Sequence, residues 1–287
     1  MKKIKTGLLC SLCVLVAATI AIAVHALMPS PGASLDATEF DGILVQRFGF
    51  PIVASVYFVI LYLHIFIVMR YFGSKSTVSN RETGWRFGLA FALIYLAGMQ
   101  EVVVSASPFS EYGIDFVNYQ LFMGLGDAIP VFLLCIIVSR FFMKRDEKET
   151  INKKFPIKKK ILLIMTITIL FSIERIMGYG CGYLASDIKE YPIPVIIWTI
   201  LFGVILGCAY LLVRPIYKSE TGNIHTVQCV ILTLGINWIW FNSFMGLILK
   251  DTIGQMLLRS GIDVLALFIG VKLYEQVIVK KSNRCVQ

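Results

Sequence analysis

Eight apolar segments follow one another along this chain, and each is long enough to cross a membrane as a helix. A helix rises about 1.5 Å per residue, so roughly 20 residues cover the hydrocarbon layer of a bilayer. The segments are Thr6–Leu27, Pro51–Met69, Phe87–Ala106, Leu121–Ser139, Ile161–Tyr183, Pro192–Val213, Thr226–Leu249 and Ile253–Val271. Only 16% of the residues are charged, against roughly 25% in soluble domains. The sequence therefore predicts an all-α polytopic membrane protein with eight transmembrane helices in contact with the lipid bilayer.

The basic residues between these segments fall on one side of the predicted membrane. Alternate connections contain few of them, namely Arg47, Lys189 and Lys250. The remaining connections and both ends of the chain are rich in them: Lys2, Lys3, Lys5, Arg70, Lys75, Arg81, Arg86, the stretch from Arg140 to Lys160, Arg214, Lys218, Lys280, Lys281 and Arg284. Because cytoplasmic loops collect Lys and Arg, both termini are expected in the cytoplasm. This asymmetry accounts for the net charge of +9 without a nucleic-acid partner.

The first segment has two interpretations. A basic start, an apolar stretch and the residues Val24-His25-Ala26 are also found in secretory signal peptides with a poor cleavage site. The apolar part is longer than the roughly 7–15 residues typical of that role, which favours a retained span. The abundance of Lys and Ile is typical of a bacterial protein, so we expect the bacterial cell membrane.

The chain also suggests an internal four-plus-four repeat. Residues 1–143 would form the first four-helix half, 144–160 a basic cytoplasmic loop, and 161–287 the second half with a short cytoplasmic tail. The two halves would be parallel, because four spans return the chain to its starting side. Asp127 in the fourth span would correspond to Asp263 in the eighth, and Gly98 to Gly235. Chance alignment of apolar helices is the alternative.

Several polar and ionisable residues fall inside the predicted spans, mostly in the outward-facing half. They are Glu101, Asp127, Glu174, Arg175, Asn237, Asn242, Arg259 and Asp263. A single charged residue at a helix centre costs about 2.5–3.5 kcal/mol on insertion scales, so these residues are expected to meet.

Specific pairs follow from the spacing. Arg259 and Asp263 are four residues apart and are expected to pair on one helix face. Arg175 needs a partner from another span, such as Glu101 or Asp127. The carboxylates outnumber the arginines, and a cation or a shared proton would balance the excess. We interpret these residues as a site for a small solute, an ion or a proton.

Pro130 predicts a break in the fourth span. Proline lacks an N–H, so the carbonyl of Gly126, beside Asp127, loses its helical donor. Transporters build cation sites at such broken helices. The alternative is a kink that only shapes helix packing.

Other chemistry is not indicated. Cys10 and Cys13 have CxxC spacing but no second pair or histidine cluster beside them. The histidines, His25, His64 and His225, lie at different depths, which argues against haem or a His-built zinc site. The sequence has no glycine-rich phosphate loop and no recognisable nucleophile set. We therefore expect no metal, no cofactor and no catalytic residue.

Three functions are compatible with these features. The charge cluster favours a secondary transporter or permease for a small solute or ion. A non-catalytic sensor, immunity-type protein or complex subunit would instead use the charges to fix helix register, and the sequence does not name its protein partner. A membrane-embedded enzyme acting on a lipid or lipid-linked substrate would use Glu101 or Asp127 as a general base.

Overall fold

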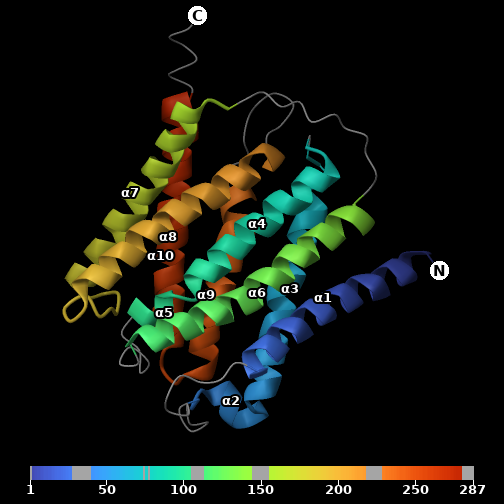
Figure 1. Ribbon diagram of the computed structural model, residues 1–287, viewed down its shortest axis with the longest axis horizontal. Coiled ribbons are helices and arrows are strands. Elements are labelled where there is room, and N and C mark those ends of the chain that lie inside the picture. Colours follow the sequence, from blue (N-terminus) through green and yellow to red (C-terminus); the bar gives the residue numbers. More distant parts are fainter. Residues whose placement is uncertain are drawn as a thin grey trace, which may run out of the picture.

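The structure of the chain, a computed structural model, is a bundle of helices (Figure 1). It describes residues 2–27, 40–73, 75–76, 78–104, 113–143, 155–217 and 228–279, and these contain helices and turns but no strand. Most of the basic stretch 144–160, His225 and the last residues of the chain lie outside the described part. Each of the eight predicted segments overlaps a described helix.

Six stretches among the described residues are long and apolar enough to cross a membrane. They lie in α1 (Lys2–Leu27), α3 (Phe50–Gly73), α6 (Gly113–Phe141), α7 (Ile157–Cys181), α8 (Pro192–Val213) with the 3₁₀ turn Arg214–Tyr217, and the π-helical segment Gln228–Gly235 with α9 (Ile236–Ile248). The chain is therefore a multi-pass membrane protein. Their outward surfaces expose Leu, Ile, Val and Phe, as lipid contact requires.

Two further long helices, α4 (Asn80–Gly98) and α10 (Ile253–Leu273), have 19 and 21 residues. They are less apolar because α4 begins with Arg81 and Glu82 and α10 contains Arg259 and Asp263. Both pack inside the bundle, α4 against α6 and α8, and α10 against α7 and α9. Figure 1 shows α4 running between α6 and α8.

Helix α4 lies further toward the predicted cytoplasmic side than the apolar pattern indicated. It begins at Asn80 because the Ser79 side chain accepts a hydrogen bond from the Glu82 backbone N–H, which caps the helix. It ends at Gly98, and a turn at Met99–Gln100 separates it from the short helix α5 (Glu101–Val104). Glu101 therefore lies immediately after a break in the third predicted span.

Helix α6 is continuous through Pro130, so the proline does not divide the fourth span into two helices. The carbonyl of Asp127 accepts a hydrogen bond from the Tyr62 hydroxyl on α3, at 3.4 Å. This carbonyl is next to that of Gly126, the one whose helical donor Pro130 removes. The interrupted helix beside a carboxylate occurs at Glu101 instead.

Two helix pairs approach closely through glycines. A Cβ atom added at Gly88 of α4 would lie 2.9 Å from Phe132 of α6, and one added at Gly207 of α8 would lie 2.9 Å from the Ile164 Cα atom of α7. Gly84 and Gly203 complete a Gly-x-x-x-Gly pair on each helix. Such small residues allow backbone contact between membrane helices. Helix α8 packs against both α7 and α4.

Candidate functional site

A fully buried ion pair joins Arg175 on α7 to Asp263 on α10. The Arg175 side chain is 0% exposed, and its Nε and Nη2 atoms donate to Oδ1 and Oδ2 of Asp263, each at 2.6 Å. A guanidinium and a carboxylate joined by two parallel hydrogen bonds have a fixed mutual geometry. Trp238 on α9 donates from Nε1 to the same Oδ2 atom at 2.9 Å. Three helices thus converge on one carboxylate.

Glu101 connects this pair to a second arginine. Its Oε1 atom accepts from Nη1 of Arg175 at 2.6 Å and lies 3.4 Å from Nη1 of Arg259. Arg175 Nη1 also donates to the Tyr179 hydroxyl, and Arg259 Nη2 donates to the carbonyl of Ala185 at 2.7 Å. The result is a buried network of arginines and carboxylates that links α5, α7, α9 and α10.

Of the two partners suggested for Arg175, the structure shows Glu101 and not Asp127, and the bidentate partner Asp263 was not among them. The predicted local pair of Arg259 with Asp263 is wrong. Both oxygens of Asp263 are taken by Arg175, one of them also by Trp238, while Arg259 reaches Glu101. The residue spacing permitted the local pair, but a neighbouring helix offered Asp263 a bidentate partner.

Asp127 does not join this network. Its partner is His25 near the end of α1, whose Nε2 atom lies 3.2 Å from Asp127 Oδ1. The same Nε2 atom lies 3.3 Å from the carbonyl of Met123. One N–H cannot point well at two acceptors, and Asp127 Oδ1 has no well-aligned hydrogen bond among the described residues.

Glu174 and Asn242 border the network without joining it closely. Glu174 Oε2 lies 4.0 Å from Arg175 Nε, at the limit of an ion pair. Asn242 donates from Nδ2 to the carbonyl of Trp238 at 3.1 Å.

Asn237 belongs to a different polar chain, deeper in the bundle. Its Oδ1 atom accepts from the Tyr95 hydroxyl at 2.9 Å, and its Nδ2 atom lies 3.4 Å from Nδ1 of His64. His64 in turn contacts the carbonyl of Leu232, in the π-helical segment, through Nε2. Asn237 is thus separate from the charged cluster predicted to contain it.

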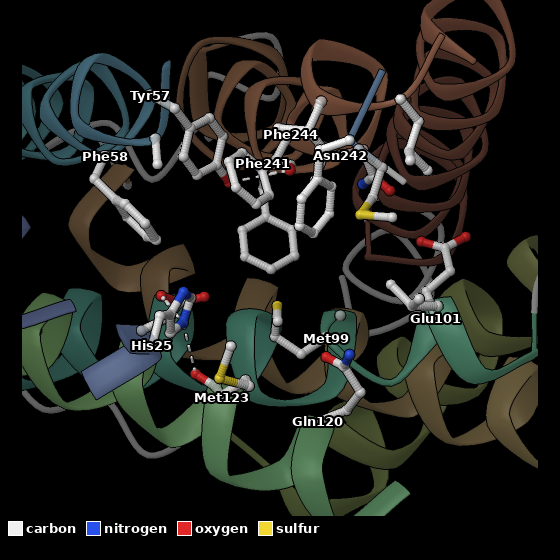
Figure 2. Close-up of a pocket in the computed structure, with 18 of the residues that line it drawn as sticks. His25, Tyr57, Phe58, Met99, Glu101, Gln120, Met123, Phe241, Asn242 and Phe244 are labelled. Carbon is white, nitrogen blue, oxygen red and sulfur yellow. Dashed lines mark hydrogen bonds and ion pairs between the residues drawn. The ribbon is translucent and has the colours of Figure 1, made fainter. Parts of the chain in front are cut away.

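A cavity of about 500 Å³ lies between the His25–Asp127 pair and the Glu101–Arg259 pair. It is at the end of the bundle where α1, α4 and α9 end and α3, α6 and α10 begin, which is the predicted outer side. Figure 2 shows His25 at one end and Glu101 at the other. Aromatic rings form one wall and more flexible side chains the opposite one: Tyr57, Phe58, Phe241 and Phe244 face Met99, Gln120 and Met123.

This arrangement has the features of a small-molecule site. Ligand pockets typically have volumes of roughly 300–1,000 Å³ and mostly apolar walls with a few placed polar groups. Of the predicted residues, Glu101, Asp127, Asn242 and Arg259 line the cavity, while Arg175 holds Glu101 from behind and is itself held by Asp263. Among the described residues, no group of three His, Cys, Asp or Glu side chains is placed to hold a metal ion.

The sequence indicated that Phe241 could wall a cavity beside Asn242, but His25, Gln120 and the rings of Tyr57, Phe58 and Phe244 were missed. His25 had one usable signal, its place near the outer end of the first span at a depth not far from that of Asp127. The sequence does not reveal that α1 packs against α6, so this signal could not be turned into a pair.

Comparisons of the chain with protein-family models, with curated proteins and with solved structures find no match. The sequence and the structure together define a multi-pass membrane protein with a buried Arg/Glu/Asp network beside an aromatic cavity.

Proposed function

We propose that this protein is a secondary transporter or permease that takes a small solute into the cavity from the outer side of the cell membrane. The observation that carries the proposal is the cavity itself, which is apolar along its walls and ionisable at both ends. Ionisable residues inside membrane proteins commonly mark substrate, ion or proton pathways. Glu101 and Asp127 would bind a cation or exchange a proton as the solute enters.

We include α4 and α10 among the transmembrane helices, which gives eight spans and two cytoplasmic termini. At about 1.5 Å per residue, helices of 19 and 21 residues cover roughly 30 Å. Their charged residues support this placement, because Arg259 and Asp263 have buried partners and Arg81 and Glu82 lie at the cytoplasmic end.

We further propose that the two halves are related by a pseudo-twofold axis. What supports it is the pattern of helix neighbours. Helix α1 packs against α3 and α6, as α7 packs against α8 and α10, and the contact of α3 with α9 has its counterpart in that of α8 with α4. The acidic residues follow the same relation, since Asp127 on α6 meets His25 on α1 and Asp263 on α10 meets Arg175 on α7.

One predicted correspondence does not fit this relation. Gly98 ends α4, whereas Gly235 lies at the junction of the π-helical segment and α9, in the middle of a span. The matching of helices therefore supports the repeat, and the matching of these two glycines does not.

The two arginines have different parts in this proposal. Arg175 already donates to Asp263, Glu101 and Tyr179, so it positions the carboxylates and is not available to a solute. Arg259 lines the cavity and is the arginine that a solute would meet. Glu101, at the break between α4 and α5, contacts both arginines.

Uptake into proteoliposomes tests the proposal. Purified protein is reconstituted and exposed to a mixture of small amines, amino acids, organic acids and sugars, and the internal contents are measured by mass spectrometry. At least one solute should accumulate well above protein-free vesicles, and Asp127→Asn should abolish its uptake. Asp115→Asn serves as the matched control, because Asp115 is an exposed carboxylate on the same helix. A solute that binds but never accumulates would instead favour a sensor.

A second candidate, a membrane-embedded enzyme acting on a lipid, is favoured by the His25–Asp127 pair. An imidazole beside a carboxylate is a common general base, and His25 faces the cavity. The described lining residues include no Ser or Cys that could act as its nucleophile. Incubation of the purified protein with mixed lipids would produce a His25-dependent product under this alternative and no new lipid species under transport.

A further inference from the structure

We propose that the cavity binds an organic cation with an apolar body, whose ammonium group is held by Asp127 beside the aromatic wall, with Gln120 as a second hydrogen-bond acceptor about two helix turns away along α6. The inference rests on the proposed function, because it names the class of solute that the same cavity takes. Three independent features of the cavity carry it, namely its charge balance, its spare hydrogen-bond acceptors and its aromatic rings.

The lining of the cavity carries a net negative charge when His25 is neutral. Four ionisable residues line the cavity, namely His25, Glu101, Asp127 and Arg259. Arg259 compensates Glu101, at 3.4 Å. Asp127 faces only His25, so a neutral imidazole leaves one carboxylate charge uncompensated at that end of the cavity. A buried charge of this kind is costly unless something pairs with it, and an incoming cation supplies the partner.

Two polar atoms on the α6 side of the cavity lack an aligned hydrogen-bond partner, and both are acceptors. Asp127 is 2% exposed and Gln120 is 7% exposed. Oδ1 of Asp127 and Oε1 of Gln120 have no aligned hydrogen-bond donor among the described residues. Buried acceptors without donors are rare in folded proteins, because each loses its hydrogen bonds to water. A ligand that fits here must therefore donate, and an ammonium N–H does so while also matching the charge.

The aromatic wall is suited to a cation. The Tyr57 and Phe244 ring centroids are 4.5 Å apart, those of Tyr57 and Phe58 are 5.1 Å apart, and Phe58 and Phe244 are 6.2 Å apart. The Tyr57 hydroxyl donates to the carbonyl of Phe241, which fixes the ring. Figure 2 shows these rings gathered along one side of the cavity. Ring faces are electronegative and attract ammonium groups, more strongly where water is excluded.

The opposite wall accommodates an apolar body. Met99 and Met123 contribute flexible thioethers that adapt to different shapes. A volume of about 500 Å³ holds a molecule with one or two rings and a short chain. Arg259 has a buried Nε atom without a partner, so an anion at the far end of the cavity is the competing expectation that the experiment must separate.

Four probes that share one aromatic body test the inference with protein in nanodiscs. They are 2-(1-naphthyl)ethylammonium, its N,N,N-trimethyl analogue, 2-(1-naphthyl)ethanol and 1-naphthylacetate, and binding is measured by equilibrium dialysis. The ammonium should bind at least about tenfold more tightly than the alcohol, and the acetate most weakly. The trimethyl analogue should fall between ammonium and alcohol, because it keeps the charge but cannot donate.

Binding of the same probes to variants shows which residues cause the preference for the ammonium. Asp127→Asn should remove the preference of the cavity for the ammonium over the alcohol, whereas Asp115→Asn should keep it. Phe244→Leu should weaken the trimethyl analogue by several-fold with less effect on the alcohol, and this variant keeps the inference testable if Asp127→Asn fails to fold. Size-exclusion chromatography and thermal unfolding of each variant report on folding independently of the probes.

The outcomes separate the inference from the proposed function. If the alcohol or the acetate binds as tightly as the ammonium, the cation class is overturned while the cavity remains a solute site. If none of the four probes binds to folded protein, the cation inference is overturned, and the uptake of the solute mixture decides the proposed function by itself. A preference for the ammonium that survives Asp127→Asn places the cation elsewhere and also overturns the inference.

Discussion

The Nε and Nη2 atoms of Arg175 on α7 each donate a 2.6 Å hydrogen bond to one oxygen of Asp263 on α10. This pair joins two helices that are far apart in the sequence and neutralises two charges that would be costly inside the bilayer if each were alone. Glu101 joins from the break after α4, so the network fixes the wall of the cavity as well as the helix packing.

Removing one member of the pair should destabilise the protein more than removing both. Arg175→Met leaves Asp263 as an unpaired buried carboxylate, and such losses cost about 3–5 kcal/mol in soluble proteins. The double variant Arg175→Met with Asp263→Leu should recover much of that loss, because no charge is stranded. Thermal unfolding in detergent measures all three. A double variant that is no more stable than Arg175→Met would contradict this account.

Glu101→Gln should impair transport more than stability. The amide keeps the shape and one acceptor oxygen for Arg175 but leaves Arg259 without its compensating charge. The cavity lining then becomes more positive, so uptake of a cationic solute should fall by at least about tenfold. Glu82→Gln is the matched control, because Glu82 pairs with Arg86 at the far end of α4. Equal losses of uptake in both variants would point to a general effect on folding.

The fold was largely predictable because the bilayer imposes one length and one composition on every span. Each predicted segment overlaps a helix, and the misplaced limits of α4 have a local cause in the Ser79 cap. A helix break was one of two interpretations of Pro130, but α6 is continuous there and the break lies at Met99–Gln100. A proline marks a missing donor, but nothing in the sequence shows that Tyr62 lies within reach of the carbonyls around it.

The site was predictable only in part, for a related reason. Insertion cost requires that buried charges meet, which is why Glu101 and Arg175 could be paired in advance. Which charges meet depends on which helices are neighbours, and the sequence does not directly show which helices pack against one another. Arg259 was therefore paired with Asp263 and Asp127 was left without His25, while Tyr57, Phe58 and Phe244 appeared as ordinary apolar sequence.

Glycine packing between α7 and α8 gives a third prediction. A Cβ atom on Gly207 would lie 2.9 Å from the Cα atom of Ile164, and backbone cannot move aside as a side chain can. Gly207→Ala should therefore lower thermal stability in detergent, by about 1–3 kcal/mol as in overpacked cores. Gly180→Ala on α7 is the control, because its Cβ would meet nothing within 4 Å. If both variants unfold at the temperature of the parent protein, the two helices are not in contact at Gly207.

The orientation of the bundle is tested by labelling single cysteines in a cysteine-free background. Lys189 is in the turn between α7 and α8, and Lys75 follows α3; both are exposed. With the cytoplasm on the basic side, a membrane-impermeant maleimide added to intact cells should label Lys189→Cys and spare Lys75→Cys until the membrane is opened. The reverse pattern would place the cavity on the cytoplasmic side and make it an inward-facing site. If both positions are labelled in intact cells, they lie on the same side of the membrane and an even number of spans separates them. That result is incompatible with α4, α6 and α7 all crossing the membrane.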